Sequence, residues 1–228
     1  MSARDLDGAV VAVVGAGGGL GAPIARLLAS KGAHLVLAGP HPERIEGVPG
    51  ATVVPIDLRD STAGDVLVAE ALERHGRLDG LVNAAGVVAF GPLVDTDDIV
   101  IEELFLTNVV GPLWLLRRVI PLLASSKGFV VNLSAVLAEQ PLPGMVAYGA
   151  TKAALTSVDL ALGRELRRAG IQVCDVRPPH TETGLAGRPI GGAAPRLPEG
   201  LDPAVVAERI VSAIESGEGE IPADRFAP

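Results

Sequence analysis

Tyr148 and Lys152, four positions apart, are the residues of this sequence best suited to moving a proton. On a helix, that spacing places both side chains on one face. A phenol with a pKa of about 10 is a poor acid or base at neutral pH, and a nearby ammonium favours its phenolate form. Tyr148 is the only tyrosine, and Lys152 is one of three lysines. An ordinary helix surface is the alternative, but the pairing of two such rare residues favours acid–base catalysis.

A glycine-rich segment, Gly15-Ala16-Gly17-Gly18-Gly19-Leu20-Gly21, follows a short run of apolar residues at 10–14. Glycines permit a tight turn there and let the backbone approach a pyrophosphate, and the N-terminus of a following helix offers free N–H groups. A flexible loop is the alternative interpretation. The position of the segment between an expected strand and an expected helix favours a phosphate-binding turn.

The scaffold for these residues is indicated by apolar strands that alternate with amphipathic helices. Strands are expected at residues 10–14, 34–38, 52–56, 78–82, 129–133 and 171–176. Helices are expected at residues 20–31, 63–75, 97–123 (bent at Gly111-Pro112), 147–169 and 204–216. This order predicts an α/β fold, a single Rossmann-type domain over residues 1–228, with a doubly wound parallel sheet and helices on both faces. The Gly- and Pro-rich stretch 178–203 is expected to form a long functional loop, with the substrate loop at about 184–200.

Composition restricts the kinds of partner. A net charge of −8 without a basic stripe argues against nucleic acid. No run of about 18 apolar residues suggests a membrane span, and the first residues lack the apolar core of a signal peptide. The single cysteine, Cys174, fits a buried core thiol and cannot form an internal disulfide. We therefore expect a cytoplasmic protein with no metal site and with neither a nucleic-acid nor a membrane partner.

Taken in order along the chain, the motifs resemble those of the short-chain dehydrogenase/reductase family. They are Gly15-x-x-x-Gly19-x-Gly21, Asp57-Leu58, Asn83-Ala84-Ala85-Gly86, Asn108, the pair Tyr148 and Lys152, and Pro178 with Thr183. The resemblance covers nearly the whole chain. It implies an NAD(P)-dependent oxidoreductase that transfers a hydride between NAD or NADP and a small alcohol or carbonyl compound.

The same resemblance implies roles for individual residues. Tyr148 would exchange a proton with the substrate oxygen, Lys152 would also bind the nicotinamide ribose, and Asn108 would help to hold a water relay. Asp57 would contact the adenine ring, and Thr183 the nicotinamide carboxamide. The full cofactor-binding set comprises Gly15, Gly19, Leu20, Gly21, Asp57, Leu58, Asn83, Ala84, Gly86, Tyr148, Lys152, Pro178 and Thr183.

A serine that donates a hydrogen bond to the substrate oxygen normally precedes the tyrosine by about 13 positions in this family, but residue 135 is alanine here. Ser134 lies one place earlier, and adjacent strand residues face opposite ways. If the strand ends in regular geometry, Ala135 takes the donor position. If the loop around Pro141 and Gly144 shifts the chain, Ser134 becomes the donor, and we expect this second outcome, with Ser134 as a catalytic residue.

Cofactor choice stays open at the sequence level. NAD-preferring enzymes place an acid at the end of the second strand, where this chain has Ala38-Gly39-Pro40, with neither that acid nor the arginines that NADP enzymes often have. Gly18 likewise stands where many NADP enzymes have a basic residue. His41 and Arg44 are candidates for a 2′-phosphate contact, although a helix-cap or surface role is the more common one for such residues. Further along, His180 is a candidate for a residue that faces the substrate, although an exposed loop position is the more common one for such a histidine.

Two functions are compatible with this pattern. The first is an oxidoreductase acting on a small, uncharged and moderately hydrophobic substrate, since 87–94 and 184–200 are mostly apolar or small. The second is an NAD(P)-binding protein with weak or no turnover that acts as a sensor or scaffold, an alternative that Ala135 keeps open. In either case a homodimer or homotetramer is expected, built on the helices that carry Asn108 and Tyr148.

Overall fold

The computed structural model describes residues 4–45 and 48–226. Its centre is a seven-stranded parallel sheet with the strand order β3-β2-β1-β4-β5-β6-β7. The strands are β1 Val10–Val14, β2 His34–Gly39, β3 Thr52–Pro55, β4 Gly80–Asn83, β5 Phe129–Leu133, β6 Gln172–Val176 and β7 Glu220–Ile221. The predicted doubly wound parallel sheet is confirmed.

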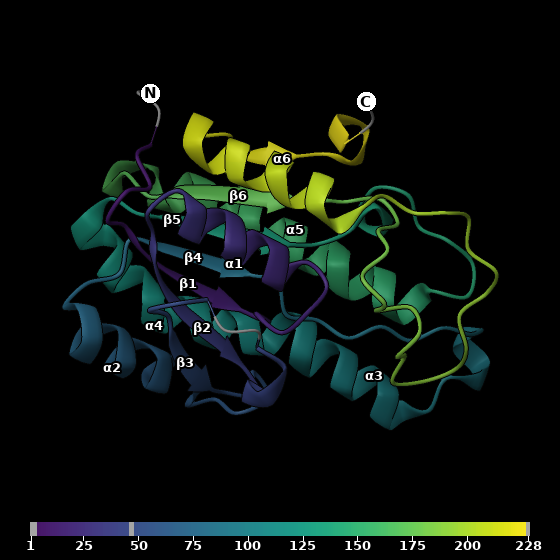
Figure 1. Ribbon diagram of the computed structural model, residues 1–228. Coiled ribbons are helices and arrows are strands. Elements are labelled where there is room, and N and C mark those ends of the chain that lie inside the picture. Colours follow the sequence, from purple (N-terminus) through teal and green to yellow (C-terminus); the bar gives the residue numbers. More distant parts are fainter. Residues whose placement is uncertain (1–3, 46–47, 227–228) are drawn as a thin grey trace.

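Helices cover both faces of the sheet (Figure 1). The α-helices are α1 Gly21–Ser30, α2 Ala63–His75, α3 Asp98–Phe105, α4 Gly111–Ser126, α5 Val146–Glu165 and α6 Pro203–Ser216. On β1, Val11 and Val13 pack in the core under α1 and α6, whereas Val10 and Val14 pack in the core under α2, α4 and α5. Because both faces are buried, the strands are apolar at successive positions.

The long helix predicted over 97–123 is divided by a π-helical turn at Leu106–Val110, between α3 and α4. Pro112 lacks an N–H group and therefore cannot bond to the Asn108 carbonyl, four residues earlier. The Gly111 N–H instead bonds to the Leu106 carbonyl, five residues earlier. The irregularity thus begins before the Gly111-Pro112 pair, and it contains Asn108.

The helical stretch Asp98–Ser126 is long and apolar enough, by length and composition, to cross a membrane. One side of this stretch, however, is part of the protein core: Leu115, Leu116, Val119 and Leu123 pack with strand residues of the sheet. It is a core helix of this fold.

The seventh strand was missed by the sequence prediction. It has only two residues, Glu220–Ile221, and it exists because β6 offers free backbone groups at the sheet edge: Asp175 N–H bonds to Gly219 O and Arg177 N–H to Ile221 O. A segment this short carries no periodic pattern.

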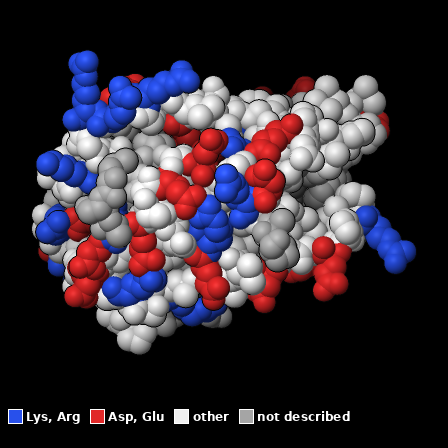
Figure 2. All heavy atoms as spheres, turned by 90° about the horizontal axis from the view of Figure 1, so that it is seen from above, with Lys and Arg blue, Asp and Glu red and all other residues white. Residues whose placement is uncertain are grey.

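Residues 177–202 form a long loop beyond the carboxyl ends of the strands, drawn in yellow-green on the right of Figure 1. Open parallel sheets bind their ligands at this edge. Figure 2 shows the molecule from the side of α6, with acidic and basic side chains interleaved over the middle of that face and a largely uncharged region toward the loop end.

Candidate active site

A cavity of about 630 Å³ opens at the carboxyl edge of the sheet. Twelve of the predicted site residues line it: Gly15, Gly19, Leu20, Asp57, Leu58, Ala84, Gly86, Ser134, Tyr148, Lys152, Pro178 and Thr183. The other three, Gly21, Asn83 and Asn108, are buried directly behind its wall. The structure thus gathers in one place residues that are spread over most of the chain.

The glycine-rich turn fits a diphosphate group. Gly15 has a φ of +80°, and a Cβ there would lie 2.6 Å from the Ala85 nitrogen. A Cβ at Gly21 would lie 2.2 Å from the Gly15 carbonyl oxygen, and one at Gly19 would lie 2.4 Å from the Thr183 carbonyl oxygen. The N-terminus of α1 has no side-chain cap and no acid in its first turn. The three motif glycines are therefore required by close approach, and the helix end behind them suits an anion.

The turn after β4 is held by buried polar side chains. Asn83 Oδ1 accepts a hydrogen bond from Ala85 N at 3.3 Å, and Asn83 Nδ2 donates to Asn132 Oδ1 at 3.1 Å. Asn132 Nδ2 in turn donates to Asp159 Oδ1 at 2.5 Å. Neither Asn132 nor Asp159 was among the predicted site residues, although Asn132 is the one polar residue of the otherwise apolar strand β5.

Burial raises the pKa of Asp159 to about 8, and the charge of Asp175 adds to this effect, while the bond from Asn132 and the charge of Lys152 oppose it. Asp159 is therefore largely protonated at neutral pH. In this neutral state it connects α5 to the cavity turn without placing a full charge in the core.

Asn108 lies inside the π-helical turn and fastens the segment that follows Gly86. Its Oδ1 accepts from Val87 N at 2.9 Å, while its Nδ2 donates to Val87 O at 2.9 Å and to Thr151 Oγ1 at 3.1 Å. The side chain thereby joins the π-helical turn, the cavity wall and α5. The side chains of Asn108 and Lys152 both lie beside Gly86. A Cβ on Gly86 would be 3.3 Å from Asn108 Oδ1 and 3.4 Å from Lys152 Nζ.

Tyr148 and Lys152 lie on the same side of α5 and line the cavity together. Lys152 Nζ is 5.8 Å from the centroid of the Tyr148 ring and donates to Leu133 O at 2.8 Å. Burial raises the pKa of Tyr148 above its ordinary value. Burial also lowers the pKa of Lys152 to about 8, an effect that the charges of Asp175 and Asp159 oppose. At neutral pH the phenol therefore holds its proton, and the lysine is mostly charged.

Ser134 is oriented differently from our expectation. The β5–β6 ladder continues beyond Leu133, with Ser134 N bonded to Val176 O and Val136 N to Pro178 O, and Ala135 is fully extended. The loop shift that would turn Ser134 toward the substrate therefore does not occur. The Ser134 hydroxyl instead bonds to Thr156 Oγ1 at 2.9 Å, on α5. Ala135 packs in the same apolar cluster as Tyr148.

Asp57 lines the adenine side of the expected cofactor site but is already paired. Its two carboxylate oxygens accept three bonds from the Arg59 guanidinium, the shortest 2.6 Å to Oδ2. The Arg59 hydrogen bonds lower the pKa of this carboxyl below its ordinary value. Asp57 is thus an ionised but largely neutralised group.

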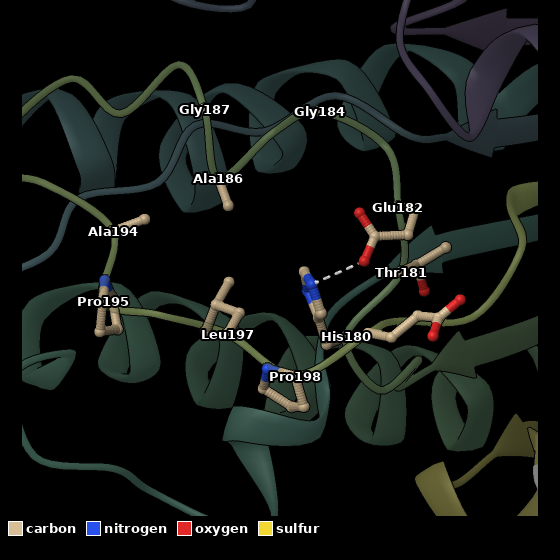
Figure 3. Close-up of a pocket in the computed structure, with 11 residues that line it drawn as sticks. His180, Thr181, Glu182, Gly184, Ala186, Gly187, Ala194, Pro195, Leu197 and Pro198 are labelled. Carbon is tan, nitrogen blue, oxygen red and sulfur yellow. Dashed lines mark ion pairs between the residues drawn. The ribbon is translucent and has the colours of Figure 1, made fainter.

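A second chamber of about 510 Å³ lies under the long loop and shares His180, Thr181, Ala186 and Leu197 with the main cavity. Figure 3 shows the His180 ring directed into it, facing Ala186 and Leu197, with Glu182 beside it. His180 Nε2 lies 3.3 Å from Glu182 Oε1, which also accepts from Gly200 N at 2.8 Å. His180 is therefore a wall residue of the chamber, which corrects the expectation of an ordinary exposed loop histidine.

A glycine-rich turn after the first strand, with a tyrosine and a lysine at the same cavity, is the arrangement found in dinucleotide-binding oxidoreductases of the Rossmann type. Residues 9–189 match the short chain dehydrogenase family. The chain belongs to the short-chain dehydrogenase/reductase family of NAD(P)-dependent oxidoreductases.

Individual relatives agree with this assignment. The chain is 29% identical over 217 residues to an uncharacterized oxidoreductase of Staphylococcus haemolyticus, covering 92% of each chain. It is 33% identical over 194 residues to 2,3-dihydro-2,3-dihydroxybenzoate dehydrogenase of Bacillus subtilis, covering 81% of this chain and 74% of the relative. Its fold is similar to 3-ketoacyl-(acyl-carrier-protein) reductase of Brucella melitensis complexed with NADH, with a TM-score of 0.85, 25% identity and coverage of 97% and 100%.

Proposed function

We propose that this protein is an NAD(P)-dependent oxidoreductase that interconverts a small, uncharged carbonyl compound and its alcohol. The observation that carries the proposal is the meeting of Tyr148 and Lys152 at the cavity that the phosphate turn borders. Neither residue alone would indicate this chemistry, since a buried tyrosine or lysine is common in other roles.

In this reaction, the nicotinamide supplies or accepts the hydride when the cofactor is bound. Tyr148 donates its phenolic proton to the carbonyl oxygen of the substrate, or takes it back in the reverse direction. Its protonated state at neutral pH suits the step in which a proton is given to the carbonyl oxygen. Lys152 places a positive charge beside the ring and stabilises the phenolate that remains after proton transfer.

Asn108 acts as a positioning residue. Its three hydrogen bonds hold Val87 and Thr151, and therefore fix the cavity wall relative to α5. We assign the binding of the cofactor phosphates to the turn at Gly15, Gly19 and Gly21, where any larger side chain would collide with the backbone or with Thr183.

We leave Ser134 out of the reacting set, because its hydroxyl is bonded to Thr156. The donor position belongs to Ala135, which has no polar side-chain atom. The substrate oxygen therefore receives its hydrogen bond from Tyr148 without a serine partner. An enzyme lacking one oxyanion donor can lose about 10²–10³ in rate, as seen in other enzyme classes.

An uncharged substrate fits the chamber under the loop. Its lining combines apolar and small residues with Glu182 and Glu199, and contains neither lysine nor arginine among the described residues. A carboxylate or phosphate on the substrate would be repelled there. The cytoplasmic location expected from the sequence stays a prediction.

The test is a panel of ketones and secondary alcohols assayed with NADH and NADPH, together with direct measurement of cofactor binding. Turnover of an uncharged member, lost in Tyr148→Phe, is the expected result. Cofactor binding without turnover across a broad panel would instead support the alternative of a sensor or scaffold, which the alanine at 135 favours.

A further inference from the structure

The end of β2 contains no acidic residue. The strand finishes at Ala38-Gly39 and is followed by Pro40. In dinucleotide-binding folds, a carboxylate at this place binds the ribose 2′-hydroxyl of NAD, and an arginine nearby accommodates the 2′-phosphate of NADP. We propose that this enzyme prefers NADP(H) over NAD(H), and that Arg44 binds the 2′-phosphate. The inference rests on the proposed function, because it requires a nicotinamide dinucleotide in the cavity.

The space at this position is open. Gly39 lines the cavity, and a Cβ built on it would meet no atom within 4 Å. Asp57 is the nearest acid on the cavity wall after β3, and the Arg59 guanidinium neutralises it through three hydrogen bonds. A phosphate dianion at the end of β2 therefore encounters room, and the two carboxylates among the described lining residues, Asp57 and Glu103, are both paired with Arg59.

The backbone of Arg44 lies between a residue of the protein core and the glycine-rich turn. It ends a short 3₁₀ helix, Pro42–Arg44, whose next residue, Ile45, is buried in the core cluster under α1. The Arg44 backbone lies against the glycine-rich turn, since a Cβ on Gly17 would be 3.2 Å from the Arg44 carbonyl oxygen. Arg44 therefore lines the same part of the cavity as Gly17 and Gly39.

Two other basic residues that line the cavity, Arg59 and His41, are already paired. Arg59 bridges Asp57 and Glu103, and His41 Nδ1 lies 3.2 Å from Glu43 Oε1. For Arg44, the residues that the structure describes include no carboxylate within ion-pair distance. A guanidinium is always charged and matches a phosphate with two parallel N–H bonds, so Arg44 is the group best suited to the 2′-phosphate.

Binding measurements on the purified protein without substrate test this inference. Dissociation constants for NADPH and NADH are determined by isothermal titration for the wild type, Arg44→Ala, Gly39→Asp and Arg74→Ala. We expect NADPH to bind the wild type at least about tenfold more tightly than NADH. Arg44→Ala should weaken NADPH binding by about tenfold to a hundredfold, the range for a charge-assisted contact, and leave NADH within about twofold.

The two other variants test whether the cofactor preference depends on a charge at the end of β2 or only on the net charge of the protein. Gly39→Asp fits without collision and restores the acid of NAD-preferring enzymes, so it should reverse the preference. Arg74→Ala removes an exposed arginine paired with Glu70 on α2 and should change neither constant. NADH binding as tightly as NADPH overturns the inference and leaves the proposed function intact. Equal weakening of both cofactors by Arg44→Ala overturns the role of Arg44, and failure of both cofactors to bind overturns the proposed function itself.

Discussion

Burial sets the protonation states of the two reacting side chains, Tyr148 and Lys152. It raises the pKa of the phenol, which then keeps its proton at neutral pH, and lowers the pKa of the ammonium to about 8. The negative charge of Asp175 acts against the second effect and helps to keep Lys152 charged. In these states Tyr148 is able to donate a proton. The positive charge of an oxidised nicotinamide ring would further stabilise the phenolate that results.

The two residues should respond differently to substitution. Tyr148→Phe removes the proton donor but keeps the ring, so turnover should fall by about 10²-fold or more while cofactor affinity changes little. Lys152→Ala should weaken both turnover and cofactor binding, because its ammonium is assigned to the ribose as well as to the tyrosine. Steady-state kinetics and cofactor titration check this, and wild-type rates in both variants would exclude the mechanism.

The alanine at the donor position leads to a prediction in the opposite direction. Ala135→Ser should raise kcat, because it adds a hydrogen bond that strengthens as charge develops on the substrate oxygen. Ser134→Ala should leave kcat nearly unchanged and cost about 1 kcal/mol of stability through the lost bond to Thr156. A Ser134→Ala variant with strongly reduced kcat and kcat/KM, measured on the same substrate, would restore Ser134 as the donor.

Asp159 makes the stability of the protein dependent on pH. The folded protein keeps this proton up to a pH of about 8, whereas the ordinary pKa of the group is 3.8. Stabilisation by the protonated carboxyl is therefore fully present below pH 3.8 and is lost as the pH rises through about 8. Asp159→Asn resembles the protonated form, so its Tm relative to wild type should increase by several degrees, roughly, between pH 5 and pH 8. A Tm difference independent of pH, measured by calorimetry, would contradict this.

The π-helical turn between α3 and α4 links the position of α4 to the residues that line the cavity. Gly111, the first residue after the π-helical turn, lies against Leu58, where a Cβ would be 2.3 Å from the Leu58 carbonyl oxygen. Leu58 itself lines the cofactor cavity. The same turn places Asn108 at Val87 and Thr151. The turn therefore joins the position of α4 to the geometry of the site.

Substitution at Gly111 should be costly for this reason. Gly111→Ala should destabilise the protein by about 1–3 kcal/mol, which corresponds to a Tm lower by roughly 5 °C. Gly163→Ala, near the end of α5, is the matched control, since its Cβ would lie 3.9 Å from the Val173 Cβ, an ordinary contact. The control should raise stability by about 0.5–1 kcal/mol because alanine favours helix. Equal Tm values for the two variants would show that the Leu58 contact does not constrain α4.

Over the whole molecule, the outer sides of α4 and α5 carry apolar side chains. Leu113 is 42% exposed and Leu160 is 48% exposed. On the same two helices, Leu116 is buried in the core cluster on the side of α2, and Leu162 packs against that cluster. A homodimer or homotetramer therefore stays a prediction, and Leu113 and Leu160 are the exposed apolar residues of α4 and α5 on which it rests.

Light scattering at micromolar protein concentration checks the oligomeric state. We expect a dimer or tetramer for the wild type and a smaller species for the double variant Leu113→Glu and Leu160→Glu, because two charges would be buried without partners. Val94→Glu, at a residue that is 91% exposed but lies before α3, is the control and should not change the mass. A stable wild-type monomer would exclude the interface.

Local pattern was sufficient for the order of β1 to β6 and of the helices, for the glycine-rich turn after β1 and for the placement of Tyr148 and Lys152 on one side of α5, because each depends on spacing within a few residues. The orientation of Ser134 required the ladder between β5 and β6, and β7 exists only by pairing with β6. The link between Asn132 and Asp159 joins residues 27 positions apart. These features depend on contacts between segments that are distant in sequence. Such contacts form only when the sheet assembles, and a local periodic pattern therefore cannot predict them.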